Sequence, residues 1–163
     1  MMTLLIIAII LTLAYNAVLI VRNKGIPPSL SHSFYIFGGN PKGFIFYGYL
    51  VAMFFLLIIP MIEETPEQWE WLPFIALASL GFTGAAADFF DIKQTKTVHI
   101  VAASIAGLFS VLWAIVVGYW YLTVIFAIVS SIIACINQKS KIYWFEMGGF
   151  ALVFLTLFLR LLT

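Results

Sequence analysis

The sequence predicts an all-α, polytopic membrane protein: a six-transmembrane-helix bundle with both termini on the external side. Three observations predict this class. The chain is rich in apolar residues, six of its segments are long enough to cross a bilayer, and its basic residues fall almost entirely on one side of the resulting topology. Together they predict a single transmembrane domain over residues 1–163.

Composition excludes a soluble domain. Of the 163 residues, 64% are hydrophobic, 17% are aromatic and only 9% are charged, and the mean hydropathy is +1.11. Soluble domains carry about 25% charged residues. A net charge of +1, without any run of lysines and arginines, also argues against a nucleic-acid partner. The single cysteine, Cys135, excludes an intrachain disulfide.

Six apolar segments match the roughly 20 residues that a helix needs to cross a bilayer. They cover residues 1–21, 43–62, 66–90, 98–117, 119–136 and 142–163. The apolar run 98–136 is about twice the length of one span. Gly118-Tyr119-Trp120 divides it into a tight helical hairpin. The first segment has no basic residue before it and Arg22-Asn23-Lys24 after it, so we expect a retained helix rather than a cleaved signal peptide.

The third helix is predicted to begin near Pro66. Thr65-Pro66-Glu67-Gln68 has the pattern of a capping box with proline at the first helical position. The glutamates around this end of the helix are interpreted as a solvated turn in preference to a cation-attracting mouth. They are Glu63, Glu64, Glu67 and Glu70.

The basic residues orient these helices in the membrane. With the N-terminus outside, seven of the eight lie in cytoplasmic loops: Arg22, Lys24, Lys42, Lys93, Lys96, Lys139 and Lys141. Basic residues are enriched on the cytoplasmic side of membrane proteins. Arg160 falls on the external side, close enough to the C-terminus to snorkel to the interface. We therefore expect a multi-pass protein of a bacterial inner membrane or a plasma membrane.

The loop over residues 25–42 is the longest between the predicted helices. Gly25-Ile26-Pro27-Pro28 cannot continue a helix, and Gly38-Gly39-Asn40-Pro41 favours a turn. The aromatic, hydroxyl-rich stretch between them is too short to span. It is predicted to be an interfacial or re-entrant segment on the cytoplasmic side.

Polar residues gather near the cytoplasmic ends of the predicted helices. Ionisable groups inside a span cost at least about 2.5 kcal/mol near its centre, so each is a candidate for function. Glu146 follows Lys141 by about 8 Å along its helix and is the deepest of them. The candidate pocket residues are Asp88, Asp91, His99, Glu146, His32, Ser31 and Asn16. The alternative is that the shallow charges snorkel and that Asp88 and His99 form one structural hydrogen bond.

Metal binding is a weaker possibility at the same place. Asp88, His99 and Glu146 are suitable ligands for zinc or manganese. No HxxxH, HExxH or ExxH spacing is present, so the ligands would have to converge from separate segments. A haem relay across the membrane is not expected, because His32 and His99 lie on the same side. The sequence therefore leaves the cofactor and any catalytic residue unassigned.

One stretch resembles a known family. Gly81-Phe82-Thr83-Gly84-Ala85-Ala86-Ala87-Asp88-Phe89-Phe90, followed by a short loop and Val98-His99-Ile100-Val101-Ala102, is similar to a pattern in small six-span membrane proteins of the DRAM/Sfk type. The stretch from Gly25 to Ser31 resembles uncharacterised membrane proteins of gut bacteria and their phages. The resemblance covers about a quarter of the chain, and the first loop lacks the acidic motif of the DRAM type. It implies six helices and draws attention to Asp88 and His99, and it implies no activity.

Three functions remain open. The first is a membrane protein whose cytoplasm-proximal pocket binds or transports a small molecule, an ion or a lipid. The second is a lipid-acting enzyme, metal-dependent or not, with His99 or Glu146 as general base. The third is a non-catalytic accessory subunit that binds another membrane protein. The expected partners are membrane lipids, a second copy of the chain or another membrane protein. Against transport, the sequence shows no internal repeat with broken helices at matched positions.

Overall fold

The protein is all-helical, as predicted, throughout the part of the chain that the structure describes. The structure is a computed structural model, and it describes residues 1–38, 43–86 and 93–163. Within these ranges it contains helices and turns and no strand. The α-helices are α1 (Met2–Asn23), α2 (Ser33–Ile36), α3 (Phe44–Glu63), α4 (Trp71–Ala85), α5 (Lys93–Val116), α6 (Trp120–Ile136) and α7 (Lys141–Arg160). Two 3₁₀ turns, η1 (Glu67–Trp69) and η2 (Gln138–Ser140), precede α4 and α7.

Among the described residues, four helical segments are long and apolar enough to cross a membrane. They are Met2–Asn23, Phe44–Glu63, Lys93–Val116 and Gln138–Arg160. The apolar helix α6 is shorter, with 17 residues, and the described part of α4 has 15. Large apolar side chains are exposed along most of these helices, for example Leu13, Phe55 and Ile128. Such a surface suits contact with lipid rather than water.

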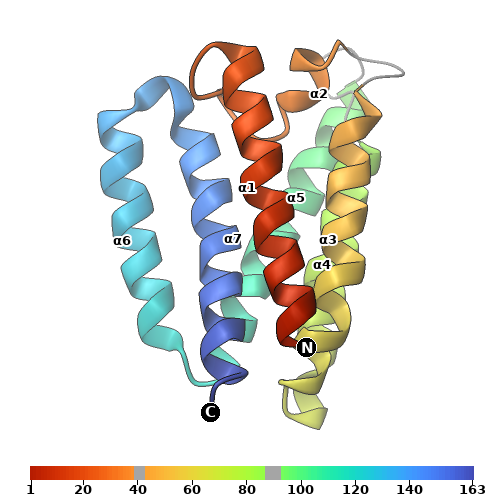
Figure 1. Cartoon of the computed structure of the whole chain (residues 1–163), viewed down its shortest axis with the longest axis vertical. Helices are drawn as coiled ribbons and strands as arrows, with labels where there is room; N and C mark the ends of the chain where they lie inside the picture. Colours follow the sequence, from red (N-terminus) through yellow and green to blue (C-terminus); the bar gives the residue numbers. More distant parts are fainter. Residues whose placement is uncertain (39–42, 87–92) are drawn as a thin grey trace.

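Five helices enclose the centre of the bundle, and the sixth long helix lies outside them. Around this ring, α1 packs against α3, α3 against α4, α4 against α5, α5 against α7, and α7 against α1. Helix α6 packs mainly on the outer side of α7 (Figure 1). Both chain termini lie at the same end of the bundle (Figure 1). The helix ends that carry the described lysines of the loops lie at the opposite end, here called the loop end.

The predicted hairpin between α5 and α6 is present. Helix α5 ends at Val116 and α6 begins at Trp120. Gly118 connects them with φ at +96°, a left-handed conformation that glycine adopts without strain. The apolar run is therefore divided where the sequence predicts, and the division lies near the chain termini.

The predicted start of the third helix at Pro66 is wrong. Pro66 is extended, with ψ at 137°, and α4 begins only at Trp71 after the turn η1. The Thr65 hydroxyl caps neither element. It donates to the Met61 carbonyl and accepts a 2.7 Å hydrogen bond from the buried Trp113 Nε1, so a tertiary contact replaces the expected capping box. The predicted end at residue 90 lies outside the described residues.

The helix that carries His99 begins earlier than predicted. Helix α5 starts at Lys93 rather than at residue 98. His99 therefore lies in its second turn, with its side chain directed at α4. The remaining predicted boundaries agree with the structure to within three residues.

An ion pair joins two segments at the end that holds the termini. Arg160 Nε lies 3.5 Å from Glu64 Oε2, and the guanidinium also donates to the Glu64 carbonyl. Arg160 thus has a carboxylate partner there, in addition to the interfacial position expected for it.

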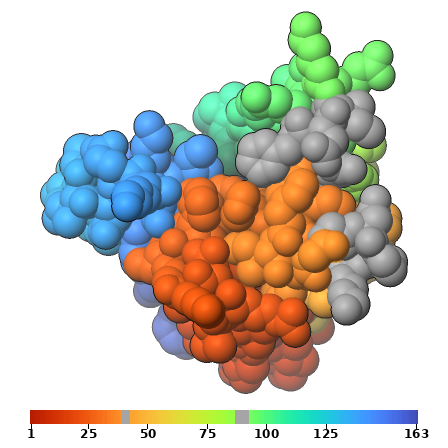
Figure 2. Space-filling model, turned by 90° about the horizontal axis from the view of Figure 1, so that it is seen from above, coloured from red at the N-terminus to blue at the C-terminus, as the bar shows by residue number. Residues whose placement is uncertain are grey.

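The loop before α3 folds into the mouth of the bundle. Leu30, Ser31, Ser33 and Phe34 are at most 3% exposed. Viewed from above, this segment covers the middle of the bundle between the α6–α7 connection and the start of α5 (Figure 2). Hydrogen bonds tie it to the start of α7, where Tyr143 N–H donates to the Pro28 carbonyl. The described part of the loop is therefore a largely buried cap over the mouth of the bundle.

Candidate functional site

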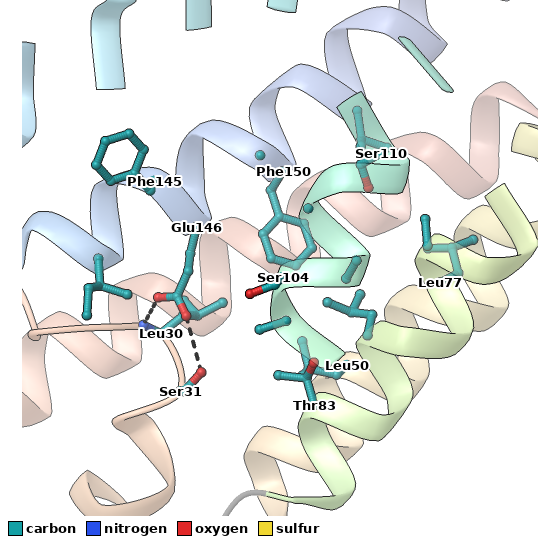
Figure 3. A pocket seen from close by; sticks show the side chains of 18 of the residues that line it. Leu30, Ser31, Leu50, Leu77, Thr83, Ser104, Ser110, Phe145, Glu146 and Phe150 are labelled. Carbon is teal, nitrogen blue, oxygen red and sulfur yellow. Dashed lines mark hydrogen bonds between the residues drawn. The ribbon is translucent and has the colours of Figure 1, made fainter. Parts of the chain in front are cut away.

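A cavity of about 400 Å³ lies beneath this cap, inside the ring of helices. It is bounded by α3, α4, α5, α7 and the loop. Its walls are almost entirely apolar, and the polar side chains in them come from four elements (Figure 3). These polar side chains are Ser31, Thr83, Ser104, Ser110 and Glu146. Several lining residues of α5 and α7, such as Ser104 and Phe145, are exposed, which indicates that the cavity opens between these two helices.

Glu146 is the one charged side chain among the described residues that line the cavity. It lies in the second turn of α7 and reaches across to the loop. One carboxylate oxygen accepts the backbone N–H of Leu30, and the other accepts the Ser31 hydroxyl at 3.2 Å (Figure 3). The carboxylate thereby holds the cap in place and remains at the wall of the cavity.

His99 extends this network to α4. The imidazole is 6% exposed. Its Nε2 lies 3.0 Å from Ser31 Oγ, and its Nδ1 lies 3.0 Å from the Thr83 carbonyl and 3.1 Å from the Ala86 carbonyl. One serine hydroxyl therefore connects the glutamate of α7 to the histidine of α5.

The hydrogen-bond partners restrict where the protons lie. Carbonyl oxygens only accept, so Nδ1 of His99 must carry a proton to bond to them. Ser31 has one hydroxyl proton to give. If it donates to Glu146, Nε2 of His99 is protonated and donates to Ser31; if it donates to Nε2, Glu146 is protonated and donates to Ser31. A complete network thus holds one proton that can reside on either His99 or Glu146.

Asn16 belongs to a different cluster. It is buried between α1 and α7, where its amide nitrogen donates to the Thr12 carbonyl and its oxygen accepts the Tyr143 hydroxyl at 2.9 Å. Tyr15 and Tyr49 stack beside it, with ring centroids 4.2 Å apart. Asn16 is not among the residues that line the cavity. The structure therefore gives it a packing role between helices.

Of the remaining candidates, the structure describes only His32. His32 lies before α2 with its ring 5.8 Å from that of Tyr35, and it does not line the cavity. Burial lowers the pKa of His32 below its ordinary value. Asp88 and Asp91 lie outside the described residues. The cavity thus brings together Ser31 and Glu146 from the predicted set, with His99 in contact with Ser31.

The described residues give no support to a metal centre. Among them, no group of three or more histidine, cysteine, aspartate or glutamate side chains lies close enough to bind an ion. Both ring nitrogens of His99 already have protein partners. A metal ligated by His99 and Glu146 would have to displace Ser31 from between them.

The sequence predicted Glu146 as a candidate residue but did not predict its hydrogen-bond partner. Its principal partner is the backbone N–H of Leu30, which carries no sequence signal. Thr83 and Ser104, which also line the cavity, were not among the candidate residues predicted from the sequence. Comparison of this chain with protein-family models, with curated proteins and with solved structures finds no match.

Proposed function

We propose that this chain is an integral membrane protein with six spans and external termini, which holds a small amphipathic molecule or a lipid in the cavity beneath its cytoplasmic cap. The observation that carries the proposal is Glu146, a carboxylate at the wall of an otherwise apolar cavity of about 400 Å³. Cavities of this size and polarity are typical of small-molecule sites. Polar groups at membrane depth are costly and commonly mark such sites.

Two observations support the topology. Helices α4 and α6 lie alongside the four long apolar helices and run between the same two ends of the bundle (Figure 1). A bilayer crossed by the four would therefore be crossed by all six. The basic residues at the loop end favour that end as cytoplasmic, because lysine and arginine are enriched on that side. The described ones are Arg22, Lys24, Lys93, Lys96, Lys139 and Lys141.

Native mass spectrometry of protein released from mild detergent tests the proposal. We expect the wild-type chain to retain a stoichiometric small-molecule or lipid mass, and Glu146→Gln to lose most of it. Glu67→Gln, which removes the same charge from an exposed turn at the other end, is the matched control. If both the wild type and the control emerge bare from several membrane extracts, the proposed binding function is wrong.

A second candidate is a lipid-acting enzyme, and the contact between Ser31 and His99 favours it. A serine hydroxyl 3.0 Å from an imidazole whose other nitrogen is held by carbonyl oxygens is the arrangement of an activated nucleophile. Ser31 Oγ would attack an ester carbonyl carbon and His99 Nε2 would take its proton. The ester C–O bond then breaks, His99 returns the proton to the leaving alcohol, and water hydrolyses the acyl-serine.

A fluorophosphonate probe that labels activated serines distinguishes the two candidates. The enzyme predicts labelling of the wild type that Ser31→Ala abolishes. His99→Asn keeps the contact to the α4 carbonyls but loses Nε2, so it would fold and lose labelling. Absence of labelling in a folded wild type would exclude this candidate and leave the binding function.

A further inference from the structure

We infer that the ligand of the cavity is an amphipathic amine, with its cationic head beside Glu146 and its apolar body between α3, α4, α5 and α7. This inference rests on the proposed binding function and names the chemical class of the ligand. It is carried by the charge of the cavity wall, the unused hydrogen-bonding capacity of Glu146 and the depth of the apolar walls.

The charge of the wall selects the head group. The described lining residues include one carboxylate and no lysine, arginine or histidine. An anionic head would be repelled by Glu146 and would find no cation in the wall. A neutral head would leave the carboxylate with no cation in direct contact, because the His99 imidazole reaches it only through the Ser31 hydroxyl. A cationic head attracts the carboxylate at close range in surroundings of low dielectric constant.

Among the described residues, Glu146 forms no ion pair, and its carboxylate can accept further hydrogen bonds. Within residues 1–38, 43–86 and 93–163, the ion pair formed is Arg160–Glu64, at the far end of the bundle. Glu146 instead accepts hydrogen bonds from Leu30 N–H and the Ser31 hydroxyl. An ionised carboxylate can accept about four hydrogen bonds, so acceptor sites remain for an ammonium group. A buried charge is stabilised when it is both paired and hydrogen-bonded.

The apolar walls suit a hydrocarbon body. Leu50, Leu77 and Phe150 face the cavity beside the carboxylate (Figure 3). Leu57 and Val153 continue the wall toward the middle of the bundle. Lipid tails are as apolar as these side chains, so transfer of a chain from the bilayer gains little. Discrimination between ligands must therefore come from the head group at Glu146.

A matched set of ligands tests this selectivity. Dodecylamine, dodecanol and dodecanoate share one chain and differ in the head group. Binding is measured by thermal shift and native mass spectrometry on the wild-type chain in nanodiscs of zwitterionic lipid. We expect the amine to bind at least about tenfold more tightly than the alcohol, and the carboxylate to bind least, because a hydrogen bond to a charged group exceeds a neutral one by that order.

Two variants assign the effect to the site. In Glu146→Gln, whose amide oxygen can still accept the Leu30 N–H, the preference for the amine over the alcohol is expected to fall to near one. Glu67→Gln should keep the wild-type preference. Ser104→Phe fills the cavity without removing the carboxylate, and it should weaken the amine and the alcohol alike.

The outcomes separate this inference from the proposed function. Equal or tighter binding of the alcohol in the wild type would overturn the amine class and leave the binding function standing. Amine binding that survives both Glu146→Gln and Ser104→Phe would place the ligand in the lipid rather than in the cavity, and it would overturn the inference. Failure of all three ligands, together with bare protein in native mass spectra, would contradict both.

Discussion

The carboxylate of Glu146 on α7 accepts the backbone N–H of Leu30, a residue 116 positions earlier in the chain. Together with the bond from Tyr143 N–H to the Pro28 carbonyl, this hydrogen bond ties the cap to the helix that forms one wall of the cavity. It also supplies a partner for a backbone donor that the burial of Leu30 removes from solvent. The same side chain therefore contributes to the fold and is the centre of the proposed site.

Glu146→Ala and Glu146→Gln should separate these two contributions. Alanine leaves the Leu30 N–H buried without an acceptor, which costs about 1–3 kcal/mol, whereas glutamine offers an amide oxygen in the same place. We expect a clear fall in the unfolding temperature for alanine and a smaller one for glutamine. Limited proteolysis should cut the loop over residues 25–38 faster in the alanine variant. Equal stability of the two variants would mean that this bond does not hold the cap.

The buried pair at the opposite end gives a second stability prediction. Thr65→Val removes the acceptor of the Trp113 indole N–H while keeping the shape of the side chain, and should cost about 1–3 kcal/mol. Thr65→Ser, which retains the hydroxyl, is the control. In the background of Trp113→Phe, the change Thr65→Val should cost much less, because the donor is already absent. Unfolding temperatures of the four proteins measure the coupling, and additive effects would refute it.

Packing of α6 onto α7 gives a third stability prediction. A Cβ atom on Gly148 would overlap Ser130 Oγ on α6 but would stand at ordinary contact distance, 3.4 Å, from Ser130 Cβ. The hydroxyl can rotate away, so Gly148→Ala should destabilise the protein by only about 1 kcal/mol, and adding Ser130→Ala should recover most of the loss. Gly48→Ala, on an exposed face with nothing within 4 Å, is the control and should be neutral or stabilising. Unfolding temperatures report each change, and an unaffected Gly148→Ala would show that the Ser130 hydroxyl rotates away without cost.

The helix boundaries were predicted correctly from the sequence where a single local cause determines them. Gly118 divides a long apolar run because the backbone there has a positive φ. Thr65 shows the limit of this reasoning, since its hydroxyl is engaged by Trp113, 48 residues away, rather than by the adjacent helix. A capping pattern describes what a residue can do locally, and a tertiary donor of this kind can outcompete it.

The candidate site, too, was predictable from the sequence only in part. The depth of Glu146 marked it as a candidate, because a lone carboxylate in an apolar helix is costly. Neither its partner, Leu30, nor the separation of Asn16 from the cavity was predictable, because both depend on how the loop and α1 pack against α7. Sequence thus identified the costly group, and the fold determined which neighbours satisfy it.

The loop end should lose stability in acid through His32. Burial lowers the pKa of this imidazole from its ordinary 6.5, so the folded protein binds the proton less readily than the unfolded chain. Between the folded pKa and about 6.5 the unfolded state holds more protons, so stability falls as the pH decreases through this window. His32→Gln should therefore lose less in unfolding temperature than the wild type on going from about pH 8 to about pH 5, while the two are alike at the higher pH. Thermal unfolding in detergent across this range measures the difference, and parallel curves for the two proteins would show that His32 titrates alike in the folded and unfolded states.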